Sequence, residues 1–144
     1  MKKLAYLIVA LVLAYGFARE QGISIPGISD TAPAANSELL QAYSRQQSDV
    51  QVQGSGVVVK VLRDDLKGSR HQKFILKIAG GPSVLVAHNI DLAPRIDGLR
   101  AGDSVEFYGE YEWNAKGGVV HWTHRDPGRR HVDGWLKHDG RTFE

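Results

Sequence analysis

The residues best suited to bind a metal ion or transfer a proton are concentrated near the C-terminus. The segment GGVVHWTHRDPGRRHVDGW, residues 117–135, holds three of the six histidines and two of the three tryptophans. His121 and His124 form an H-x-x-H pair, which chelates a metal on a helix because residues i and i+3 share a face. On a regular strand these two side chains point to opposite faces, unless the strand ends between them. The pair alone therefore does not predict a metal site.

Histidines from two hairpins would form a metal site if they met at one rim of the fold. The candidate ligands are His71, His88, His124 and Asp126, and a divalent metal ion is the cofactor that they would take. Such an ion activates water, and Arg70 would stabilise the charge of a phosphate. The corresponding enzyme is a metal-dependent hydrolase of the phosphodiesterase or nuclease type, with Arg70, His71, His124 and Asp126 as its catalytic residues.

The same part of the chain also predicts a binding surface without catalysis. Barrels of the OB type bind oligonucleotides and oligosaccharides on the face of their second and third strands. The candidate ligand-binding residues are Arg70, His71, Lys73, His88, Asn89, Tyr108, His121 and Trp135. For Trp135 we also consider a structural role, in which this aromatic side chain docks a C-terminal tail on the barrel.

Five segments that alternate apolar and polar residues must position these side chains. They are residues 50–62, 71–78, 83–89, 104–113 and 118–124. Gly54 and Gly56 predict a bend or bulge in the first segment. An irregular connection, with Asp91 as the cap of one helical turn, joins the third segment to the fourth. This pattern predicts a mostly β fold, a small five-stranded OB-fold-like barrel, with an SH3-like barrel or an open sheet as alternatives.

The loop lengths of two hairpins predict which side chains share a face. A four-residue AGGP loop places Ile78 opposite Ser83. Leu85 would then face the core, and His71 and His88 would share the outer face.

A four-residue NAKG loop places Tyr111 opposite Val120 in the second hairpin. His121 would then point outward opposite Glu110, and Trp122 would cover Gly109 in the core. A one-residue slip in either hairpin would reverse every face.

The N-terminus predicts export from the cytoplasm. Two lysines precede a short apolar run, so residues 1–18 are expected to be a signal peptide or an uncleaved N-terminal anchor. A linker over 19–36, a short helix over 37–48, the barrel over 49–126 and a docked tail over 127–144 follow. We expect a periplasmic or secreted protein, which touches the inner membrane only through residues 1–18 if they are retained.

Composition excludes several classes of function. Removing residues 1–18 removes Lys2 and Lys3 and no acid, so 18 basic and 16 acidic residues become 16 and 16. This neutral balance argues against tight nonspecific binding of DNA. The absence of cysteine excludes iron–sulfur clusters and thiol catalysis. No phosphate-binding loop, G-x-S-x-G or H-E-x-x-H motif occurs.

Four segments carry a resemblance to a known family: DDLKGSRHQKFIL, VAHNIDLAPRI, GDSVEFYGEYEWNAKGGVVHWTHRDP and GWLKHDG. They resemble the small bacterial family of unknown function number 3465, over residues 54–140. The resemblance implies a short exported domain and no established activity. We therefore expect a cell-envelope binding module, with an oligosaccharide, an oligonucleotide or a protein as partner, and keep the metal-dependent hydrolase as the alternative.

Overall fold

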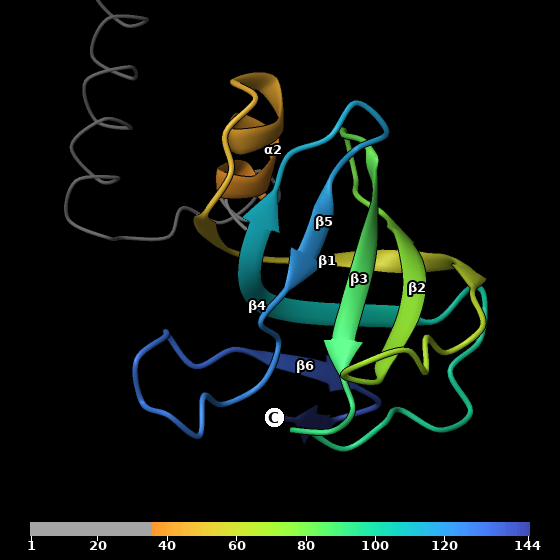
Figure 1. The fold of residues 1–144 in the computed structure, drawn as a ribbon. Coiled ribbons are helices and arrows are strands. Elements are labelled where there is room, and N and C mark those ends of the chain that lie inside the picture. Colours follow the sequence, from red (N-terminus) through yellow and green to blue (C-terminus); the bar gives the residue numbers. More distant parts are fainter. Residues whose placement is uncertain (1–35) are drawn as a thin grey trace, which may run out of the picture. The chain divides into compact units, whose positions relative to one another are not determined.

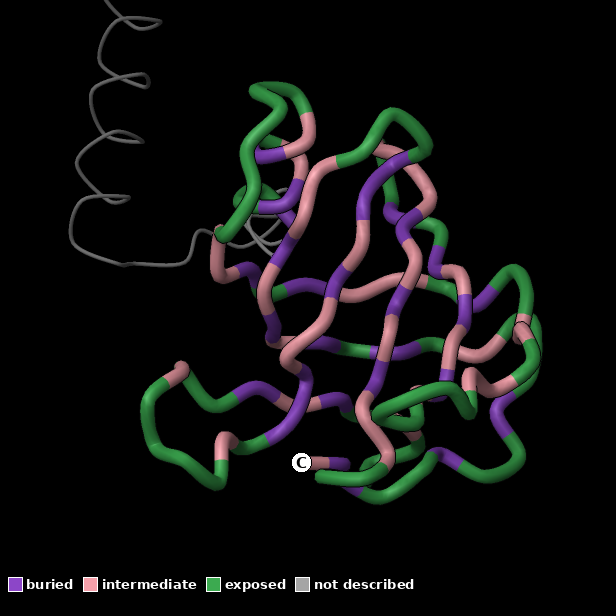
Figure 2. The backbone as a smooth tube through the Cα atoms, in the orientation of Figure 1, coloured by how far each residue is buried: buried purple, intermediate pink, exposed green. Residues whose placement is uncertain are grey.

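Strands in which buried residues alternate with more exposed ones form the framework of the computed structural model, which describes residues 36–144 (Figures 1 and 2). The predicted leader over 1–18 and nearly all of the predicted linker lie outside these residues. The elements are α2 (Ser37–Ser44), β1 (Val50–Val61), β2 (His71–Lys77), β3 (Ser83–Asn89), β4 (Ser104–Glu112), β5 (Val119–His121), β6 (Trp135–His138) and β7 (Arg141–Phe143). Among the described residues, no helix has the length and apolarity that crossing a membrane requires.

Five strands close into a barrel in the order β1-β2-β3-β5-β4, and β1 also pairs with β4. All these pairs are antiparallel except β3 with β5. β1 pairs with β4 through Val57 and with β2 from Val57 onward. The prediction of a mostly β, five-stranded barrel preceded by one short helix is confirmed.

The bulge in β1 lies elsewhere than predicted. The register with β2 shifts between Val58 and Lys60, not at Gly54 or Gly56. A Cβ atom on Gly56 would lie 2.8 Å from the carbonyl oxygen of Lys77. Gly56 therefore permits a close approach of two backbones, which is the other common reason for a glycine within a strand.

The β2–β3 hairpin has a longer loop than predicted, and this reverses the faces of β3. Lys77, not Ile78, lies opposite Ser83. Ile78 belongs to the turn, where its N–H donates to the carbonyl of Pro82 at 3.2 Å. As a result His88 faces the core and Leu85 faces outward, so the predicted outer pair of His71 and His88 is wrong.

The β4–β5 hairpin has the predicted register, with Tyr111 opposite Val120 and Glu110 opposite His121. The prediction that Trp122 covers Gly109 is wrong. β5 ends at His121, and Trp122 adopts a left-handed backbone conformation with φ of 53°. Thr123 is fully buried instead, and its methyl group lies 3.0 Å from where a Cβ of Gly109 would be.

The C-terminal residues form a hairpin that extends the sheet beyond the barrel. β6 pairs with β4, with Leu136 opposite Phe107, and β7 pairs with β6. Leu136 is fully buried and Phe143 nearly so, and both belong to the main hydrophobic core. Strand pairing and these two side chains join the C-terminus to the barrel, and the ring of Trp135 lies beside that of Tyr108 on β4.

The buried side chain of Tyr111 stabilises the turn between β4 and β5 through a hydrogen bond. Its hydroxyl donates to the carbonyl oxygen of Gly117 at 2.7 Å, and burial raises the pKa of Tyr111 to about 12. Tyr111→Phe leaves that carbonyl without its partner, so we expect the free energy of unfolding to fall by about 1–2 kcal/mol in urea denaturation. A loss below about 0.5 kcal/mol would show that water replaces the hydroxyl at this carbonyl.

Candidate functional site

A pocket of about 240 Å³ opens on the outer face of the barrel, across β2, β3 and the end of β5. Its lining includes three histidines and one tryptophan. The lining residues are Ser69, His71, Ala87, Asn89, Leu92, His121, Trp122 and His124. Four of them, His71, Asn89, His121 and His124, are among the residues singled out in the sequence.

Backbone carbonyls orient two of the pocket's histidines. Nδ1 of His71 lies 2.8 Å from the carbonyl oxygen of Ser69, and Nδ1 of His124 lies 2.7 Å from that of Arg125. Because a carbonyl only accepts hydrogen bonds, each Nδ1 must carry the proton. The Nε2 atom of each neutral ring is then left as a hydrogen-bond acceptor.

The predicted cations Arg70 and Lys73 do not line the pocket and are paired with carboxylates. Arg70 Nε donates to Asp91 Oδ1 at 2.6 Å, and Lys73 Nζ lies 3.5 Å from Asp65 Oδ2. The backbone N–H and the guanidinium of Arg70 hold the pKa of Asp91 below its usual range. The prediction that Asp91 caps the turn after β3 is wrong. Asn89 caps it instead, because its Oδ1 accepts hydrogen bonds from two backbone N–H groups.

His88 is enclosed in the core and is not available to a ligand. Its Nε2–H donates to the carbonyl oxygen of Pro94 at 2.9 Å, and the hydroxyl of Thr123 donates to its Nδ1 at 2.7 Å. Burial lowers its pKa to about 4. Both ring nitrogens therefore already have protein partners, which removes His88 from the predicted metal and ligand-binding sets.

Asp126 has a local structural role at the start of the loop between β5 and β6. Its carboxylate accepts hydrogen bonds from the backbone N–H groups of Gly128, Arg130 and His131, and these bonds hold its pKa below the usual range. Of the four predicted metal ligands, only His71 and His124 line the pocket. The predicted four-residue metal set therefore does not converge.

Tyr108 and Trp135 form a separate aromatic patch. They lie opposite each other on β4 and β6, with ring centroids 6.0 Å apart. Lys137 Nζ lies 4.4 Å from the centroid of Trp135. Neither Tyr108 nor Trp135 lines the histidine pocket.

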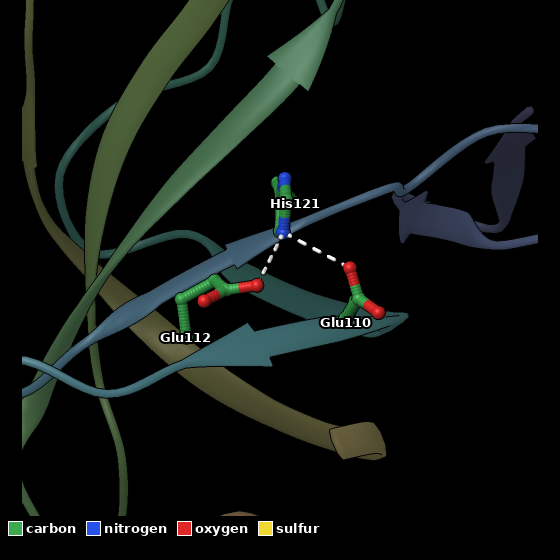
Figure 3. Close-up of side chains that lie close together, drawn as sticks. All are labelled: Glu110, Glu112 and His121. Atoms are coloured by element: carbon green, nitrogen blue, oxygen red, sulfur yellow. Dashed lines mark ion pairs between the residues drawn. The ribbon is translucent and has the colours of Figure 1, made fainter. Parts of the chain in front are cut away.

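Two carboxylates and a histidine meet beside the pocket, on β4 and β5 (Figure 3). His121 Nε2 lies 3.2 Å from Glu110 Oε2 and 3.4 Å from Glu112 Oε1. On the other side of Glu110, His131 Nε2 lies 3.3 Å from Oε1. The three donor atoms of Glu110, Glu112 and His121 lie within 4.8 Å of one another.

The sequence alone did not identify Glu112 and His131 as site residues. Glu112 could have been predicted, because residues 110 and 112 point to the same face of the sheet as His121 on the neighbouring strand. His131 lies in the irregular loop between β5 and β6, where its ring stacks on Trp122 at a centroid distance of 3.9 Å. No periodic pattern predicts that contact.

Electrostatics set Glu112 apart from its neighbours. Burial raises its pKa, and the nearby Asp49 carboxylate raises it further. His121 Nε2 is buried and makes no hydrogen bond of suitable geometry among the described residues. A cation bound here would offset the negative charge that Glu112 and Asp49 place near each other.

Comparison with known proteins gives a family and no activity. The family model described as protein of unknown function (DUF3465) matches residues 23–144. No curated protein matches the chain.

Proposed function

The chain belongs to the DUF3465 family, and we propose that it is a periplasmic or secreted module that binds a neutral oligosaccharide in the pocket across β2, β3 and β5. The observation that carries this proposal is the position of the pocket. OB-type barrels bind oligomeric ligands on the face of strands two and three, where this pocket opens. The closed five-strand barrel supports the assignment of an OB-like fold.

The chemistry of the pocket favours a neutral, polar ligand over a nucleic acid. Histidine and serine side chains offer hydrogen bonds to sugar hydroxyls, and Trp122 offers an aromatic surface. Binding of phosphates would need free cations. Arg70 and Lys73 lie outside the lining of the pocket and are each paired with an aspartate.

Export rests on the first 18 residues of the sequence, which precede the described residues. Their basic start and short apolar run are typical of a secretory signal. An envelope location would bring the pocket to the oligosaccharides of the cell envelope. The internal hydrogen bonds of His88 and Asp126 argue against the hydrolase alternative, which needs both side chains as metal ligands.

A titration of the full-length chain with defined hexasaccharides tests this function. We expect chemical-shift changes at His71 and Asn89 and a change in tryptophan fluorescence, because Trp122 lines the pocket. His71→Ala should weaken binding by about tenfold, the cost of one lost hydrogen bond. His138→Ala is the matched control, because it removes a histidine that lies outside this pocket.

Two outcomes would contradict the proposal. One is the absence of any shift at the pocket residues with every hexasaccharide. The other is tighter binding of a single-stranded DNA octamer than of any hexasaccharide at physiological salt, which would assign the pocket to nucleic acid.

A further inference from the structure

The contacts of His121 differ from an ordinary histidine–carboxylate hydrogen bond. Elsewhere in this chain His138 Nε2 makes such a bond to Asp103 at 2.9 Å. His121 Nε2 instead lies between two carboxylates, 3.2 Å from Glu110 and 3.4 Å from Glu112, and its geometry to each is poor for a hydrogen bond. Two ligands bound at about 2.0–2.1 Å to one tetrahedral ion lie roughly 3.3–3.4 Å apart. The observed spacing therefore matches that of three groups that share one ion, and all three donor atoms lie within 4.8 Å of one another.

The second histidine of the cluster is oriented as an outer partner of such a site. His131 Nδ1 donates to the carbonyl oxygen of Val132 at 2.8 Å, which fixes the ring. Stacking on Trp122 fixes it further. Its Nε2 faces the Glu110 oxygen that His121 does not contact. Metal-binding carboxylates are commonly held in this way by a second side chain.

We propose that Glu110, Glu112 and His121 bind a divalent first-row transition metal ion, best matched by Zn²⁺, and that His131 positions Glu110. Two carboxylates balance the charge of a divalent ion. The imidazole selects Zn²⁺ over Mg²⁺ and Ca²⁺, which prefer sites made of oxygen alone. The side chains of His121 and Glu112 are 34% and 38% exposed, so an ion can reach the site from solvent. His121 also lines the pocket proposed for saccharide, so Zn²⁺ binding is measured in the absence of saccharide.

Calorimetric titration of the full-length chain with ZnCl₂ and with MgCl₂ tests the site. We expect one Zn²⁺ per chain and at least about 100-fold weaker binding of Mg²⁺. Glu112→Gln removes a ligand and should weaken Zn²⁺ binding by about 100-fold or more, whereas His131→Gln should weaken it by about tenfold. In NMR spectra, Zn²⁺ should shift the ring signals of His121 before those of His71.

Glu106→Gln is the matched control. Glu106 lies on the same strand and points to the same face as Glu112, but lies outside the cluster, so its variant should bind Zn²⁺ like the parent chain. Urea denaturation confirms that each variant is folded. The proposal is overturned if Zn²⁺ does not bind below about 1 mM, or if Glu112→Gln and Glu106→Gln bind equally. It is also overturned if His71→Gln weakens binding as much as Glu112→Gln.

Discussion

Replacing Gly134 with alanine is expected to lower the free energy of unfolding by about 3 kcal/mol and to loosen the β6–β7 hairpin from the barrel. A Cβ atom at this position would lie 1.9 Å from the carbonyl oxygen of Trp122 and 2.5 Å from that of Tyr108. Both obstacles are backbone atoms, which cannot rotate away. The Gly134 N–H also donates to the carbonyl oxygen of His124 at 2.9 Å, and a shift of this residue would break that bond.

Urea denaturation and amide hydrogen exchange measure the effect of Gly134→Ala. We expect faster exchange of the β6 amide groups that pair with β4, while β2 and β3 keep their protection. Gly128→Ala is the control in the same loop, because its Cβ would meet only the Asp126 carboxylate, at 3.3 Å or more. That variant should change stability by less than about 0.5 kcal/mol. Equal stability of the two variants would contradict the close packing of Gly134.

Acidification from pH 6.5 to pH 4 is expected to remove about 3 kcal/mol of stability through His88 alone. Its pKa falls from 6.5 to about 4 on folding, chiefly because burial penalises the charged ring. The nearby His124 and His71 also lower the pKa of His88, whereas the hydrogen bond to Pro94 raises it. Since the unfolded chain takes up this proton first, stability is complete above pH 6.5 and is lost as pH falls toward 4.

Urea denaturation at several pH values between 7 and 4 isolates this contribution when the parent chain is compared with His88→Gln. The variant should be less stable at pH 7, because Thr123 and Pro94 lose well-placed partners. Its further loss between pH 6.5 and 4 should be smaller than that of the parent by about 3 kcal/mol. Lys60→Gln, which changes an exposed side chain on β1 that does not act on the pKa of His88, is the control. Parallel pH profiles for the parent and His88→Gln would refute the assignment.

The sequence predicted the barrel because its strands alternate clearly and glycine-rich turns separate them. The β4–β5 register also followed from the pattern, since only one register buries Tyr111 and Val120 together. The β2–β3 register did not follow. The segment VLVA in β3 is apolar on both faces, so hydrophobicity alone does not distinguish two registers that differ by one residue.

That one-residue difference decided which histidines reach the surface. It places His88 in the core and Asn89 at the pocket, opposite His71. The remaining site residues depend on where β5 ends. Trp122 leaves the strand in a left-handed conformation, and this turn brings His124 to the pocket and allows His131 to stack on Trp122. The point at which a strand ends in this way depends on tertiary packing, and no periodic pattern in the sequence predicts it.

The two pairings of β1 have a consequence for the order in which the chain folds. Its second half can pair at once with β2, which follows after a short loop. Its first half must wait for β4, because Val50 pairs with Tyr111 and Val57 with Ser104. Contacts between such distant positions slow folding, and the edge of residues 50–57 stays unpaired meanwhile. The folding chain is therefore expected to be most prone to aggregation before β4 pairs with β1.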